Sequence, residues 1–134
     1  MNAPVQAVAG LVWAIVAPPL LIYAATRVRR GQLRLHGTLM GLWVVVELAV
    51  FAGFTVFLEP GPRQPDLRAL PIFQIHLAFA IATLVGIAWQ LASRAAPRLR
   101  PLHRHGGPYV IMVWCLALVT GIYNYVFLYL IGAP

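Results

Sequence analysis

Four long apolar runs constrain this chain more than any other feature. Each is about 20 residues or longer, which is the length a helix needs to cross roughly 30 Å of hydrocarbon. The runs are almost continuously apolar and lack the period-2 alternation of membrane barrel strands, so helices are favoured. The sequence therefore predicts an all-α integral membrane protein with a single domain spanning 1–134, an up-and-down bundle of four transmembrane helices at about 8–26, 36–58, 71–93 and 109–132.

Composition excludes most soluble enzyme classes. The chain is 61% hydrophobic and only 10% charged, whereas about a quarter of residues are charged in soluble domains. It contains three acidic residues and one cysteine, Cys115, so it has little material for acid–base hydrolysis and no CxxC pair. A Gly-rich phosphate loop, a zinc-protease helix and a nucleophile elbow are also missing. We therefore favour a role other than catalysis.

The net charge of +7 is explained by topology. All ten basic residues are arginine, and only Arg63 and Arg68 lie between the second and third runs. The other eight lie between the first and second runs or between the third and fourth: Arg27, Arg29, Arg30, Arg34, Arg94, Arg98, Arg100 and Arg104. The positive-inside rule then predicts that the Arg-rich loops lie in the cytoplasm and that both termini lie outside. The lipid bilayer is the expected partner, and nucleic acid is not.

Polar residues recur at helical spacing inside the later runs, and such residues usually face a bundle interior. We expect three stripes turned inward: His36, Met40, Trp43 and Glu47; His76, Thr83 and Gln90; and Thr120 with Asn124. Glu47, Thr83 and Thr120 fall near mid-membrane. Glu47 is the most costly of them, and it could be a protonated structural acid, a proton-relay element or a contact to a partner subunit. His76 is interpreted as a neutral histidine bonded across the bundle, to Asn124 or Thr55.

Three histidines are expected at the cytoplasmic face: His36, at the start of the second helix, and His103 and His105, in a loop before the fourth. They could ligate a b-type haem, with His36 and either His103 or His105 as axial ligands. They could instead bind copper or another metal, with Met40 as a soft ligand one turn from His36. Alternatively, they only bond headgroups, water and loop carbonyls. The sequence leaves these three readings open, so haem b and copper are candidate cofactors and neither is required.

Three segments resemble a family of small four-helix bacterial membrane proteins that includes an assembly factor for haem-A-containing cytochrome oxidase. The segments are "GQLRLHGTLM", "FQIHLAFA" and "HRHGGPYVIMVWCLALVTGIYNYVFLY". The resemblance singles out His36, His76 and His103, and it places Trp114 and Thr120-Gly121 at the family's W and TG. The chain departs from the family at "HGGP", where a basic or polar run is expected, and it lacks a proline just before the tryptophan segment.

The resemblance implies a multi-pass protein of the bacterial inner (cytoplasmic) membrane, an accessory or assembly subunit of a respiratory or related electron-transfer complex such as an oxidase. Such a subunit would act by helix–helix contact, for which small residues allow close approach. Gly37, Gly41 and Gly53 offer that kind of surface. Two alternatives stay open: a haem-b electron carrier with bis-histidine ligation, and a purely structural subunit of a larger membrane complex.

Overall fold

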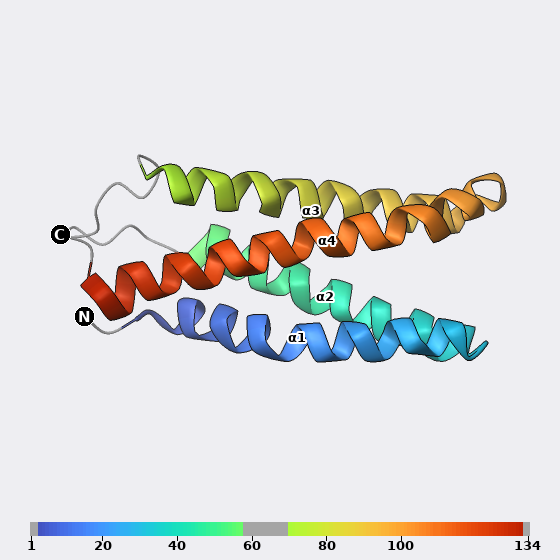
Figure 1. Ribbon diagram of the computed structural model, residues 1–134, viewed down its shortest axis with the longest axis horizontal. Coiled ribbons are helices and arrows are strands. Elements are labelled where there is room, and N and C mark those ends of the chain that lie inside the picture. The colour runs from blue at the N-terminus through green and yellow to red at the C-terminus, as the bar shows by residue number, and fades with distance from the viewer. Residues whose placement is uncertain (1–2, 58–69, 133–134) are drawn as a thin grey trace. The chain divides into compact units, whose positions relative to one another are not determined.

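The computed structural model describes residues 3–57 and 70–132, and these residues are helical apart from short connections. No strand occurs in these two ranges. The prediction of an all-helical chain with four long apolar helices is confirmed, since four helices are long and apolar enough to cross a membrane. The elements are α1 (Val5–Arg29), α2 (Leu33–Phe57), α3 (Pro71–Ala95), the 3₁₀ turn η2 (Pro97–Leu99), α4 (Arg100–Tyr125) and the π-helical η3 (Val126–Gly132) (Figure 1).

The chain divides into two compact units, Met1–Arg63 and Gln64–Pro134. Each unit is a helical hairpin: α1 packs against α2, and α3 packs against α4, as antiparallel neighbours (Figure 1). The loop predicted around Arg63 and Arg68 lies outside the described residues. The polar contacts between helices described in the next subsection are those between α1 and α2 and those between α3 and α4.

A Schellman motif ends α1 and turns the chain into α2. Gly31 has φ +73°, a left-handed conformation that glycine adopts without the steric cost of a Cβ. The Gln32 N–H donates to the Arg27 carbonyl at 2.9 Å, and the Gly31 N–H donates to the Val28 carbonyl at 3.0 Å. These bonds satisfy the last carbonyls of α1, so the reversal takes only three residues.

The connection between α3 and α4 is set by prolines. Ala96, which precedes Pro97, is extended, with φ −92° and ψ 116°, because a following proline disfavours the helical conformation. A proline also occupies the first turn of α4, Pro101, where its missing N–H leaves no helical bond unmade.

The start of the fourth helix was predicted wrongly. We expected it near residue 109 with Pro108 in its first turn, but α4 begins at Arg100 and contains Pro108. His103 and His105 consequently lie on a helix and not in a loop. The prediction followed the apolar run, whereas the helix continues through the polar, Arg-rich segment that precedes it. The first helix, α1, also contains two prolines, Pro18 and Pro19.

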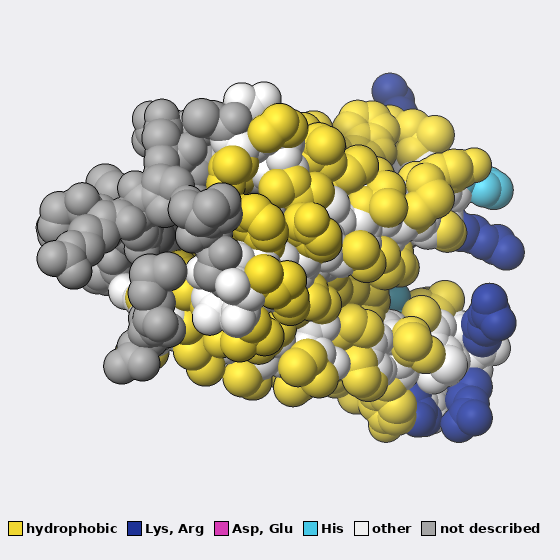
Figure 2. Space-filling model, turned by 60° about the vertical axis from the view of Figure 1, so that its left-hand side comes forward, with side chains coloured by type: hydrophobic (Ala, Val, Ile, Leu, Met, Phe, Trp, Pro, Cys, Tyr) yellow, Lys and Arg dark blue, Asp and Glu magenta, His cyan; other side chains and the backbone are white. Residues whose placement is uncertain are grey.

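Both hairpins bury small side chains and one tryptophan each, Trp43 and Trp114, and leave many other large apolar side chains exposed. A Cβ added to Gly86 would lie 2.9 Å from Val110 Cγ2, so α3 approaches α4 closely there. On outer faces, Ile15, Val45 and Val85 are each more than 60% exposed. Figure 2 shows apolar side chains covering much of the face in view, with arginine side chains at one end. Such surfaces suit contact with lipid or with other membrane helices.

Candidate functional site

Glu47 is bonded to the neighbouring helix of its own hairpin. The Trp13 indole N–H on α1 donates to Glu47 Oε2 on α2 at 2.6 Å. An indole is a donor only and a carboxyl oxygen is an acceptor, so the pair is chemically complementary whether or not Glu47 is ionised. Glu47 therefore contributes to joining α1 to α2.

His36 bonds back to α1 near the same hairpin's turn. Its Nδ1 lies 3.0 Å from the Ala24 carbonyl oxygen. A carbonyl can only accept, so Nδ1 carries the proton and a neutral His36 keeps its lone pair on Nε2. This is the tautomer that metal- and haem-ligating histidines use, so His36 fits a ligand's chemistry.

His76 makes the corresponding contact between α3 and α4. Its Nδ1–H donates to the Ala117 carbonyl at 3.0 Å and lies 3.2 Å from the Thr120 hydroxyl oxygen. The predicted bond across the helices is therefore present, and its acceptor among the described residues is the Ala117 carbonyl, which we did not name. Asn124 is one turn further along α4 than Thr120, and the Thr55 side chain lies outside the described part of the structure.

The side-chain amide of Gln90 on α3 bonds to two backbone groups of α4 that lie four residues apart. The amide orientation that satisfies its neighbours donates from the nitrogen to the His103 carbonyl at 3.1 Å and accepts from the Gly107 N–H at 2.8 Å. These are the two groups that an α-helix joins to each other. The amide thus supports α4 immediately before Pro108, which supplies no N–H to the helix.

The His103 ring lies against two groups of Gln90. Its Nδ1 is 3.1 Å from the Gln90 backbone carbonyl oxygen, which can only accept a hydrogen bond. The side-chain amide nitrogen, in the same orientation as above, is 2.7 Å from Nδ1 and can only donate. Both contacts hold His103 against α3 within its own hairpin.

The remaining predicted polar residues have separate local environments. Thr83, 2% exposed, donates its hydroxyl to the Phe79 carbonyl within α3 at 2.8 Å. Thr120 donates to carbonyls one turn back within α4. Asn124 is 8% exposed, and its amide nitrogen has no partner in the described part of the chain. His105 is exposed, with no hydrogen bond among the described residues.

The histidines do not form a metal cluster within the residues that the structure describes. Residues 3–57 and 70–132 contain no group of three or more His, Cys, Asp or Glu side chains placed to hold an ion. His36 belongs to the first hairpin, and His103 and His105 belong to the second. Ligation of one haem or metal by His36 with either of them stays a prediction.

Trp13 and the role of Gln90 were missed by sequence reasoning, although both carry a signal. Trp13 and Glu47 lie at similar distances along the chain from Gly31, on opposite sides of the turn. In an antiparallel hairpin such residues lie side by side. A polar residue could therefore have been paired with its partner by reflecting its position through the turn.

Comparison with known proteins identifies no relative: no family model, curated protein or solved structure matches the chain.

Proposed function

We propose that this chain is an accessory or assembly subunit of a larger complex in the bacterial inner membrane. It would act through contacts between its helices and those of its partner. Both termini would face outward, with the Arg-rich turns in the cytoplasm. The resemblance noted from the sequence makes a respiratory or related electron-transfer complex, such as an oxidase, the first partner to test.

The observation that supports this proposal is that polar side chains within the helices bond to the neighbouring helix of the same hairpin. The bonds of Glu47, His76 and Gln90 described above each join the two helices of one hairpin. Polar groups that serve a transport path or an active site usually face a water-filled cavity or a substrate. Here these groups join the two helices within each hairpin. The exposed side chains along the helices are largely apolar and suited to packing against other helices.

Gly41 gives the proposal a specific place to test. A Cβ added there would meet nothing within 4 Å, so the hairpin itself does not require glycine at this position. Helices in membranes approach one another most closely over small residues. We therefore expect Gly41 to lie against a partner helix.

Affinity purification of the tagged chain from its native membrane in a mild detergent tests this directly. We expect a larger membrane complex to co-purify with the unaltered chain. Gly41→Leu should remove the complex without lowering the chain's own unfolding temperature. The matched control is Val12→Leu, at a position on α1 that is 54% exposed, and it should retain the complex. A chain that purifies alone under every mild condition would refute the proposal.

A haem-b electron carrier is the second candidate, favoured by the His36 tautomer. The carrier function predicts a Soret band in the purified protein that shifts on reduction with dithionite. His36→Ala should abolish that band, whereas His76→Ala should leave it, because His76 is not one of the candidate axial ligands. A colourless preparation after expression with ample haem would exclude this candidate.

A further inference from the structure

Three arginines at the end of the α1–α2 hairpin have no protein partner among the described residues. Arg29, Arg30 and Arg34 are exposed and make no ion pair or side-chain hydrogen bond there. Arg27 differs, because its guanidinium lies 4.0 Å from the centre of the Tyr23 ring and donates to Gln32 Oε1 at 3.3 Å. The turn therefore presents three positive groups that the hairpin does not use.

No carboxylate in the described part of the chain neutralises this turn. Glu47 is the one acidic residue in residues 3–57 and 70–132. It lies well inside α2 and receives the Trp13 indole bond. The charge of the three arginines is thus available to an anion from outside the protein.

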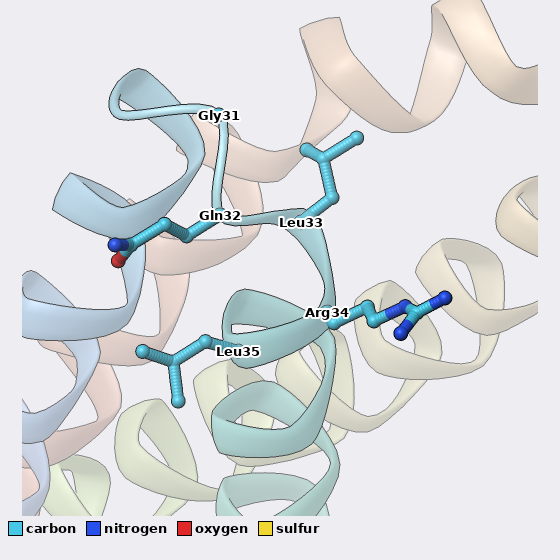
Figure 3. A pocket seen from close by; sticks show the side chains of 5 residues that line it. All are labelled: Gly31, Gln32, Leu33, Arg34 and Leu35. Atoms are coloured by element: carbon cyan, nitrogen blue, oxygen red, sulfur yellow. The ribbon is translucent and has the colours of Figure 1, made fainter.

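The surface beside these arginines is partly apolar and hollowed. A shallow hollow of about 490 Å³ is lined by Gly31, Gln32, Leu33, Arg34 and Leu35 (Figure 3). Leu33 is 65% exposed and Leu35 is 40% exposed. A cationic group beside exposed leucines, at the end of a helix that can span a membrane, matches a ligand with a negative head and an apolar tail.

The guanidinium groups of this turn suit a phosphate. Its three exposed basic residues are all arginine. The guanidinium group presents a planar fork of donors that matches two phosphate oxygens, whereas an ammonium acts as a point charge. An anionic phospholipid combines this phosphate with acyl chains.

We propose that the α1–α2 turn binds the headgroup phosphate of an anionic phospholipid through Arg29, Arg30 and Arg34. The exposed Leu33 and Leu35 lie beside the upper part of its acyl chains. This rests on the membrane location in the proposed function, but it requires no partner complex. Setting the orientation of the chain requires only positive charge. This proposal adds that the turn binds a lipid and selects it by the charge of its headgroup.

The test uses the full-length chain, delipidated in a neutral detergent, with lipid binding measured by native mass spectrometry and thermal unfolding. The unaltered chain should bind phosphatidylglycerol at least about tenfold more tightly than phosphatidylcholine, since each arginine near an anionic surface adds appreciably to binding. Arg29→Gln/Arg30→Gln/Arg34→Gln should lose most of that preference. Arg29→Lys/Arg30→Lys/Arg34→Lys keeps the charge and should bind at least about threefold more weakly, because the bidentate contacts are lost.

The other Arg-rich turn supplies the matched control. Arg94→Gln/Arg98→Gln/Arg100→Gln removes the same charge from three exposed positions and should retain most of the lipid preference. Equal losses in the two Gln variants would overturn the proposal, since net charge alone would then explain binding. Full binding by the Lys variant would overturn the guanidinium contacts.

Two further measurements keep the outcomes separate. Inorganic phosphate at the same concentration should give no comparable stabilisation, and equal stabilisation would identify a free-anion site instead of a lipid site. Circular dichroism of each variant should show unchanged helix content, and the Lys variant tests binding even if a Gln variant fails to fold. Because the protein is purified, the lipid result does not depend on whether a partner complex exists.

Discussion

At the scale of single residues, Glu47 shows how an acidic side chain is accommodated in an apolar helix. Its bond from Trp13 links two helices that are adjacent in the chain. Polar bonds between helices in membranes contribute about 0.5–2 kcal/mol, because the unfolded chain in the bilayer also finds partners. The contact should therefore stabilise the hairpin modestly and fix its register.

Trp13→Phe should lower the free energy of unfolding in detergent by about 1 kcal/mol, since it removes the donor and retains most of the ring's packing. Glu47→Gln keeps an acceptor oxygen and should cost less than Glu47→Leu. The Trp13→Phe/Glu47→Leu double variant should cost less than the sum of its parts. Strict additivity in this cycle would show that the bond contributes nothing to stability.

His76→Phe should destabilise the α3–α4 hairpin by about 1 kcal/mol, because the ring remains but its donor to the Ala117 carbonyl is lost. Thr120→Val should have a smaller effect, since the stronger of the two contacts, that to Ala117, is unaltered. Equilibrium unfolding followed by circular dichroism measures both. An effect of Thr120→Val equal to that of His76→Phe would contradict the assignment of Ala117 as the principal acceptor.

At the scale of elements, small residues decide where the helices approach closely. Gly86 faces the Val110 side chain on α4, whereas Gly41 on α2 faces open space. The same substitution should consequently have opposite effects at the two positions. Glycine is also unfavourable within a helix by about 1 kcal/mol relative to alanine.

Gly86→Ala should lower the free energy of unfolding by about 1–3 kcal/mol, because the added methyl group forces the helices apart. Gly41→Ala should raise the free energy of unfolding of the isolated chain by up to about 1 kcal/mol. Combining Gly86→Ala with Val110→Ala should restore part of the loss. No rescue by Val110→Ala would show that Val110 is not the obstructing side chain.

At the scale of the whole molecule, arginine distribution predicts orientation. Asn2→Cys and Ala133→Cys, made in a Cys115→Ala background, should react with a membrane-impermeant thiol reagent added to intact spheroplasts. Gln32→Cys should react only after the membrane is opened, because the positive-inside rule predicts that the Arg-rich turn lies in the cytoplasm. The reverse pattern would invert the proposed topology.

The sequence by itself determined the helical class and the approximate extent of the apolar helices, because length and hydrophobicity in lipid leave few other solutions. It also singled out Glu47, His76 and Gln90, three of the polar residues that form bonds between helices. It did not identify the bond to Trp13, the Ala117 acceptor of His76, or the span of Gln90 across α4. Those depend on helix register and side-chain direction, and backbone carbonyls carry no residue-specific signal in a sequence. Tertiary structure alone therefore decided which atoms join, which glycines are crowded and which histidine nitrogen is left free.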